Sequence, residues 1–356
     1  MTKKILTFVF LLAAVLLFAT WQYRLLSLLF AVMLNKAWIK SRFSHKYAYR
    51  TVVGFLMTGI FIAIPNYFQR GSTQLKYLDE NGEEVHTPLM VYAINALLPE
   101  EEVANMGIKA VAIMPSGFGC LGGRLVEDAK KDCWSGKMLS FYHPYNSLSM
   151  TGSNPGSFVY GQVWNELSRS NLDGIYITDN RKSDKPCSVL FFCHGYLGSW
   201  ELYQGVFNGL EDCLVVSIGT RDLSGIFTRK DIGKIFTKYI PYLKSQGYDI
   251  DESRIHLVGL SNGGTAADVA LGHYSDRLNS VTYISTGCHV TKHTKTNVLL
   301  IGGGRDSSSS GLPSAAKRLS ACGTNVKLYY EPEENHYILI HKSDEVIEML
   351  NSQLGK

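Results

Sequence analysis

The first 78 residues of this 356-residue chain contain no aspartate and no glutamate, although they contain ten lysines and arginines. The other 278 residues carry 25 basic and 31 acidic side chains, so the formal net charge of +4 originates in the N-terminal part. Basic residues that flank apolar segments without acidic neighbours are typical of a membrane boundary. The positive charge therefore does not indicate nucleic-acid binding, and we expect no nucleic-acid partner.

The N-terminal part also lacks an uninterrupted apolar run of the ~20 residues that a helix needs to cross a bilayer. Three shorter runs can span only if they include their flanks, and they lie at residues 5–20, 25–34 and 52–64. We expect residues 1–69 to form a multi-pass membrane anchor with two or three hydrophobic segments, which makes the lipid bilayer a partner. A cleaved signal peptide at the first run is the alternative, and the two later runs argue against it.

The seven cysteines lack metal-ligand spacing such as C-x-x-C, so we expect no metal site. Their odd number excludes complete pairing within one chain. Cys193 lies in an expected buried strand and is interpreted as a core residue. Cys120 and Cys133 are close enough in sequence to form a local disulfide in an oxidising compartment. The cysteines thus fit both an oxidising and a reducing compartment.

Residues 70–172 show no regular alternation of elements and are expected to form an N-terminal extension or a small accessory region. Within them, residues 75–85 predict a hairpin and residues 110–114 predict a strand. The sequence G-F-G-C-L-G at residues 117–122 matches G-x-G-x-x-G, but no βαβ unit with an acidic strand end follows it. We interpret it as a glycine-rich turn and expect no organic cofactor.

From residue 173 onward the pattern becomes regular, and short apolar segments alternate with helical ones. Right-handed parallel βαβ units are the default connection for such an alternation. The expected strands lie at residues 174–178, 188–193, 213–218, 254–258, 280–285, 297–302 and 326–330. The expected helices lie at residues 201–210, 230–246, 264–272, 314–321 and 342–354. We therefore predict a doubly wound, mostly parallel α/β sheet for residues 173–356.

The sequence G-L-S-N-G places Ser261 between two glycines where a strand pattern changes into a helical one. It matches G-x-S-x-G, which in a strand-turn-helix setting is the nucleophile elbow, a tight turn that exposes the serine oxygen. Gly259 and Gly263 would prevent clashes in such a turn. The N-terminus of the following helix favours developing negative charge. The same pattern also occurs in ordinary glycine-rich turns. Whether Ser261 is a nucleophile therefore depends on the presence of an acid and a base elsewhere in the chain.

A serine hydroxyl needs a histidine base, which a carboxylate orients. Asp306 and His336 each follow one of the last two expected strands, at the edge where open α/β sheets bind ligands. In this chain order Ser261, Asp306 and His336 resemble the catalytic residues of the α/β-hydrolase superfamily. The resemblance covers about residues 173–354, roughly half of the chain. It implies Ser261 as nucleophile, Asp306 as the acid and His336 as the base.

The segment H-G-Y-L-G, which begins at His194, is similar to the superfamily's H-G-x-x-G loop. Such a loop presents a backbone N–H to the oxyanion that forms during acyl transfer. The resemblance implies the N–H groups of Tyr196 and Asn262 as oxyanion-hole donors, and it leaves His194 to shape the loop. Just beyond the loop, Trp200 and Tyr203 are candidates for lining a substrate pocket, with helix packing as the alternative.

Other titratable residues compete for the roles of acid and base. The competing acids are Asp222, Glu333 and Glu334, and the competing histidines are His289, His293 and His341. His256 stands inside an expected strand and is interpreted as a core residue.

Together these residues predict a membrane-anchored serine hydrolase that cleaves carboxylic esters through an acyl-enzyme, with a small-molecule or lipid-like acyl ester as substrate. The same chemistry cleaves an amide or a peptide or transfers an acyl group, so a prolyl-oligopeptidase-like peptidase and an acyltransferase are alternative enzymes. A catalytically silent hydrolase fold that only binds a partner is the alternative from another class. The short connection between residues 285 and 297 excludes a large cap at that place.

The charge pattern predicts the side of the membrane on which the hydrolase lies. Residues 36–50 carry five lysines and arginines and no acid, so they are expected to stay in the cytoplasm, and the run at 52–64 then leads the chain outward. Alkaline phosphatase fused after Arg70 should be active, and green fluorescent protein fused at the same point should be dark. The reverse pair of results would place residues 70–356 in the cytoplasm.

Overall fold

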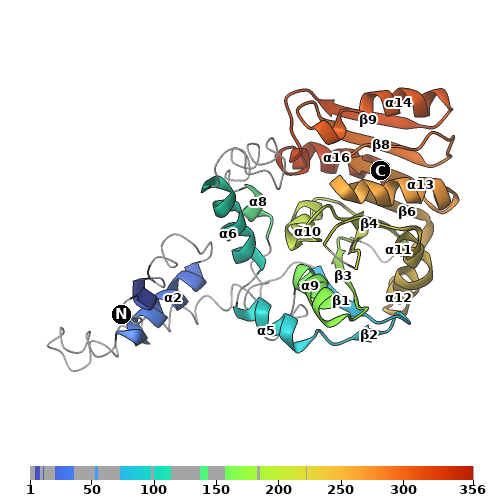
Figure 1. Ribbon diagram of the computed structural model, residues 1–356. Helices are drawn as coiled ribbons and strands as arrows, with labels where there is room; N and C mark the ends of the chain where they lie inside the picture. Colours follow the sequence, from blue (N-terminus) through green and yellow to red (C-terminus); the bar gives the residue numbers. More distant parts are fainter. Residues whose placement is uncertain are drawn as a thin grey trace.

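The computed structural model describes residues 5–8, 11, 21–35, 53–54, 73–97, 100–113, 137–142, 157–182, 185–221 and 223–355. They contain a nine-stranded sheet in the order β2-β1-β3-β5-β4-β6-β7-β8-β9, with helices on both faces (Figure 1). The strands are β1 Thr73–Leu78, β2 Glu84–Val85, β3 Asp173–Asp179, β4 Cys187–Cys193, β5 Cys213–Ile218, β6 Ile250–Leu260, β7 Ser280–Ile284, β8 Asn297–Gly303 and β9 Val326–Glu331.

The sheet is parallel from β5 through β4, β6, β7 and β8 to β9, and antiparallel where β2, β1 and β3 join it. The prediction of a mostly parallel α/β sheet is confirmed, and each of the seven strands expected after residue 173 is present. Strand β4, with the sequence C-S-V-L-F-F-C, is buried along its whole length. A strand covered on both faces carries such a continuous apolar run.

The hairpin predicted at residues 75–85 is confirmed as β1 and β2, with Gly82 at φ 87° in the connecting turn. Strand β1 pairs with β3 from Thr73 against Thr178 to Leu78 against Asp173, so this hairpin extends the main sheet. The strand predicted at residues 110–114 is wrong, because residues 110–113 lie in helix α6, Glu100–Ile113. A short apolar run has no decisive periodicity, and three glutamates in the first turn of α6 favour a helix.

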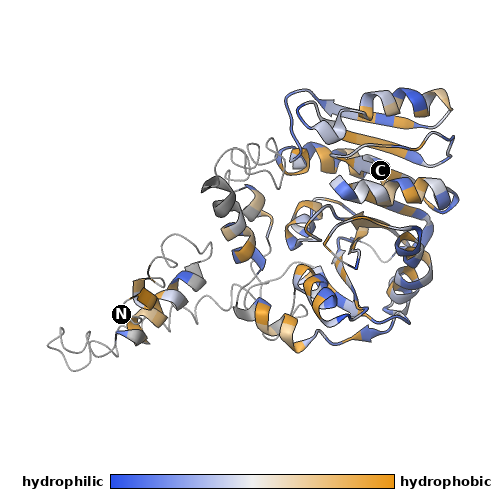
Figure 2. Cartoon of the chain, viewed as in Figure 1, coloured by the Kyte–Doolittle hydropathy of each residue, from blue (hydrophilic) through white to orange (hydrophobic). Residues whose placement is uncertain are grey.

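The helices cover the sheet in two layers around two apolar clusters. One cluster packs the sheet against α11 Arg229–Lys234, η3 Ile235–Tyr239, α12 Ile240–Ser245, α13 Gly264–His273 and α14 Leu312–Ala321. The other packs it against α8 Lys137–Ser140, α10 Glu201–Phe207, α15 Ile338–His341 and α16 Ser343–Gln353. Figure 2 shows apolar residues along the central strands and many polar residues on the covering helices. This is the layered burial that the alternating pattern predicts.

A third, smaller cluster packs α9, Phe158–Ser168, and α5, Leu89–Leu97, onto strands β1 and β3. Residues from before position 173 therefore contribute both strands and covering helices to the sheet domain. Ser157 caps α9, and Tyr77 of β1 donates a hydrogen bond to the Ser157 carbonyl at 2.9 Å. These contacts fix α9 against the sheet.

The N-terminal part contains helix α2, Trp21–Leu34, which includes the apolar run expected at residues 25–34. Among the described residues, no helix is both long and apolar enough to span a bilayer. Most of the runs at residues 5–20 and 52–64 lies outside the described residues, as do Cys120 and Cys133. Cys193 is buried in β4, as expected for a core residue.

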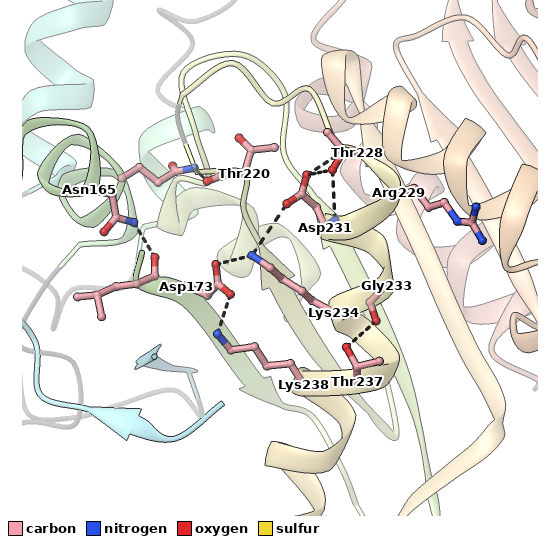
Figure 3. Close-up of polar contacts among 12 residues, drawn as sticks. Asn165, Asp173, Thr220, Thr228, Arg229, Asp231, Gly233, Lys234, Thr237 and Lys238 are labelled. Atoms are coloured by element: carbon pink, nitrogen blue, oxygen red, sulfur yellow. Dashed lines mark hydrogen bonds and ion pairs between the residues drawn. The ribbon is translucent and has the colours of Figure 1, made fainter. Parts of the chain in front are cut away.

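Asp173, at the start of β3, forms ion pairs with two lysines of the helix that covers it (Figure 3). Lys234 Nζ lies 2.9 Å from Oδ1, and Lys238 Nζ lies 2.8 Å from Oδ2. Lys238 is buried and also donates a hydrogen bond to the Asp79 carbonyl in the β1–β2 turn. Lys234 is the last residue of α11, and Lys238 lies within the π-helical segment η3. This segment precedes Pro241, a residue without an N–H for regular helix bonding. The Asp173 carboxylate thus joins β3 to the helix through both lysines, and Lys238 extends the connection to the hairpin.

We expect Asp173→Asn to destabilise the fold by about 3 kcal/mol, because it leaves the buried Lys238 ammonium without its counter-charge. Urea denaturation of the full-length chain measures the change. The matched control is Glu252→Gln, which removes the exposed partner of Lys244 and should cost less than about 1 kcal/mol. Equal losses in the two variants would show that the Asp173 pairs are no more important than a surface pair.

Candidate active site

Ser261 lies in a tight turn between β6 and α13, with φ of 54°. A side-chain-bearing residue in this left-handed region is strained. The turn also brings backbone segments so close that only glycine fits on either side of the serine. A Cβ at Gly259 would collide with the Gly263 carbonyl oxygen, and a Cβ at Gly263 would collide with the Cys193 carbonyl oxygen at the end of β4. Each motif position therefore requires glycine, because a side chain there would collide with a different carbonyl oxygen.

His336 connects Ser261 to Asp306 through its two ring nitrogens. Nε2 lies 3.0 Å from Ser261 Oγ, and Nδ1 lies 3.1 Å from Asp306 Oδ2. The three residues follow the carboxyl ends of β6, β8 and β9, which run parallel in the same half of the sheet. The structure thus brings together three side chains that are up to 75 positions apart in the sequence.

Asp306 is buried and accepts three hydrogen bonds. Besides the bond with His336, the Ser308 N–H donates to Oδ1 at 3.0 Å and Ser309 Oγ donates to Oδ2 at 2.7 Å. Burial by itself raises the pKa of this carboxyl, but the hydrogen bonds and the charge of His336 hold it below its usual value. Asp306 is therefore held as a carboxylate, the form that orients a histidine and compensates its charge.

Two serines that the sequence did not single out support these side chains. Ser309 belongs to the serine run at residues 307–310, and its position just after Asp306 was an available signal. Ser285, at φ 53° after β7, donates a hydrogen bond from its hydroxyl to the His336 carbonyl at 2.8 Å. Its partner is 51 positions away, so no local pattern pointed to it.

The residues that competed for the acid and base roles form other contacts. Glu333 pairs with Arg305, Glu334 with His341, and His289 with Asp268. Asp222 lies outside the described residues.

His256 is buried within β6, as expected for a core residue, and its Nδ1 lies 2.7 Å from Ser280 Oγ. Burial lowers the pKa of its imidazole to about 4.

The loop that begins at His194 packs directly against the serine turn. A Cβ at Gly195 would lie 2.9 Å from Ser261 Cβ, so the two backbones are in close contact. The loop is held further by the Leu197 N–H, which donates to the Leu223 carbonyl at 2.7 Å. Asn262 follows the serine in the 3-10 turn η4, Ser261–Gly263, which leads directly into α13. The structure therefore brings both segments proposed as oxyanion donors to one place.

Trp200 and Tyr203 are half-buried at the N-terminal end of α10 and pack against the apolar cluster beneath it. The Tyr203 ring lies 5.0 Å from the ring of Phe192 in β4. This contact accounts for Tyr203 by packing, while a substrate-binding role for either residue stays a prediction. Within the part of the chain that the structure describes, no group of three His, Cys, Asp or Glu side chains is arranged to hold a metal ion.

No family model and no curated protein matches this chain. Among solved structures, a thermostable esterase is similar at 17% identity, covering 51% of this chain and 60% of that chain, with a TM-score of 0.43. The Pyrococcus horikoshii acylaminoacyl peptidase is similar at 14% identity, 52% and 40% coverage and a TM-score of 0.41. A phosphonate-inhibited esterase B from Lactobacillus rhamnosis is similar at 17% identity, 51% and 79% coverage and a TM-score of 0.41. Similarity at this level transfers no activity, substrate or partner to this chain.

We expect Asp306 to contribute folding stability that depends on pH. A carboxyl whose pKa is lower in the folded state than in the unfolded state stabilises the fold above the unfolded value, about 3.9, and this contribution is lost as the pH falls through the folded value. The free energy of unfolding should therefore differ most between wild type and Asp306→Asn near neutral pH, and the difference should shrink in acid. Asp344→Asn at an exposed position controls for the loss of one charge. A difference that grew in acid would contradict the assignment.

Proposed function

We propose that this chain is a serine hydrolase of the α/β-hydrolase type, which cleaves carboxylic esters through an acyl-enzyme. The observation that carries the proposal is the position of His336, within hydrogen-bond distance of Ser261 Oγ on one side and of the Asp306 carboxylate on the other. The strained φ of Ser261 supports it, because backbone strain of this kind is retained where it positions a reacting group.

The geometry supports a two-step reaction. His336 Nε2 takes the proton of Ser261 as Oγ attacks the ester carbonyl carbon, and the N–H groups of Asn262 and Tyr196 stabilise the resulting oxyanion. When the tetrahedral intermediate collapses, the C–O bond to the alcohol breaks and His336 protonates the leaving alkoxide. His336 then deprotonates a water molecule that attacks the acyl-enzyme, and the acid leaves as Ser261 regains its proton. Asp306 stabilises the imidazolium in both steps.

Apolar side chains beside the serine support an ester with an apolar portion. Tyr196 and Leu197 are 59% and 45% exposed on the loop that packs against Ser261, and Ile226 is 50% exposed. Ile226 follows Gly225, whose backbone lies against the Gly195 carbonyl, so the three side chains come from two adjoining loops. Exposed apolar groups next to a reactive centre favour contact with the acyl or alcohol chain of a substrate.

Attachment to a membrane forms a second part of the proposal. It is supported by the acid-free N-terminal part and its three apolar runs, with the hydrolase domain on the outer side of the bilayer. An anchored enzyme with apolar side chains beside its serine would meet lipid-like esters directly.

Labelling by a fluorophosphonate probe tests the nucleophile. The full-length chain should react at Ser261 and hydrolyse p-nitrophenyl esters, whereas Ser261→Ala should do neither, because the Ser261 hydroxyl lies within hydrogen-bond distance of the His336 base. His336→Ala should lower the rate by about three orders of magnitude or more. Ser253→Ala is the matched control, since Ser253 is exposed at the opposite end of the same strand.

Labelling that persisted in Ser261→Ala would contradict the assignment of the nucleophile. A panel of ester and peptide substrates separates the esterase from a peptidase, and faster cleavage of peptides at matched side chains would reject the ester preference.

A further inference from the structure

Gln162 of α9 lies buried behind the loop that begins at His194. Its Nε2 donates a hydrogen bond to the Thr220 carbonyl at 3.1 Å and lies 3.1 Å from His194 Nε2. The Thr220 carbonyl is only an acceptor, so the amide nitrogen must face this side. Gln162 therefore directs one N–H to Thr220 and presents another to the histidine.

These contacts determine which nitrogen of His194 carries the proton. His194 Nδ1 lies 2.6 Å from the Gly195 carbonyl oxygen, which is only an acceptor, so Nδ1 must donate. Nε2 faces donors, the Gln162 amide at 3.1 Å and the Thr220 N–H at 3.4 Å. His194 is thus held as the neutral Nδ1–H tautomer, since a proton on Nε2 would meet two other donors.

The hydrogen bond from His194 orients the peptide group between Gly195 and Tyr196. The carbonyl oxygen faces His194, and the backbone of Gly225 closes on the same oxygen, at φ 69° where only glycine fits without a clash. In a trans peptide the following N–H points to the side opposite the carbonyl. The Tyr196 N–H is therefore directed away from His194, while the Gly195 backbone contacts Ser261.

We propose that Gln162 is a positioning residue of the oxyanion hole, which acts by holding His194 in the Nδ1–H tautomer and thereby fixing the Tyr196 N–H. The inference rests on the proposed function and assigns a task to the region before residue 173. Helix α9 is anchored for this task, because Asn165 Nδ2 donates to the Leu172 carbonyl at 2.6 Å beside the Asp173 ion pairs (Figure 3). Hydrogen bonds behind an active-site ligand or donor commonly set its orientation.

The tautomer is measured without reference to activity, by NMR of the full-length chain labelled with ¹⁵N-histidine, with the His194 signals assigned by their loss in His194→Gln. Wild type should show His194 protonated at Nδ1 only. Gln162→Met has a similar size and no N–H donor, so it removes the nearer of the two donors that face Nε2 and should raise the population of the Nε2–H tautomer. Glu166→Met, one turn further along the same helix and exposed, should leave the His194 signals unchanged.

Kinetics on a p-nitrophenyl ester then test the consequence for catalysis. Gln162→Met should lower kcat by about 10- to 100-fold, less than the roughly 10²- to 10³-fold loss that follows removal of an oxyanion donor itself, with KM changed less than about twofold. A residue with a merely structural role would not produce this separation of kcat from KM together with a changed tautomer. Gln162→Leu, which has no hydrogen-bond donor at any pH, should show both effects and serves if the methionine variant does not fold.

The outcomes separate the two proposals. An unchanged His194 tautomer, or an unchanged kcat, in folded Gln162 variants of an active enzyme would overturn the inference while Ser261 labelling still supported the hydrolase. A wild-type chain that neither reacted with the probe nor hydrolysed esters would overturn the proposed function, even if the tautomer responded to Gln162 as expected.

Discussion

The candidate site depends on one backbone constraint, the left-handed turn at Ser261. Strand β6 pairs with β4 almost to its end at Leu260, and helix α13 begins at Gly264. The chain must therefore change direction within the three residues 261–263. Gly259 and Gly263 permit this reversal by letting carbonyl groups approach where a side chain would collide. Helix α13 begins at Gly264, directly after the turn, so Ser261 lies close to a helix N-terminus. The same few residues thus satisfy the steric requirement of the turn and place the serine hydroxyl next to His336.

Around this turn, hydrogen bonds hold the Asp306 side chain and the backbone at His336 and Gly195. Ser309 and the Ser308 N–H hold the Asp306 carboxylate, and the Ser285 hydroxyl holds the backbone of the histidine loop. His194 holds the Gly195 peptide in the same manner. Short hydrogen bonds to backbone groups fix the orientation of loops that would otherwise sample several conformations. The side chains of the candidate site are therefore positioned at the edge of the sheet by several hydrogen bonds.

Part of the region before residue 173 packs into the sheet domain and supports it. Strands β1 and β2 form the antiparallel end of the sheet, and α9 packs on β1 and β3. Asp173 pairs with Lys234 of α11 and Lys238 of η3, and Lys238 also bonds to Asp79 in the hairpin turn. This arrangement gives α9 a fixed position from which Gln162 reaches the loop at His194. A continuous series of contacts thus leads from the hairpin through α9 to the loop at His194.

Local sequence patterns were sufficient to predict the alternation of strands and helices after residue 173, because buried parallel strands require continuous apolar runs. The same patterns also singled out Ser261, Asp306 and His336, since glycine spacing and strand ends are local features. The helix at residues 110–113 was missed because a short apolar run fits either element, and β1 was not assigned to the main sheet because strand pairing at a distance leaves no local mark. The meeting of the three side chains, and their support by Gln162 and Ser285, became visible in the folded chain. Those contacts join residues 30 or more positions apart, and their distances depend on how the whole sheet packs.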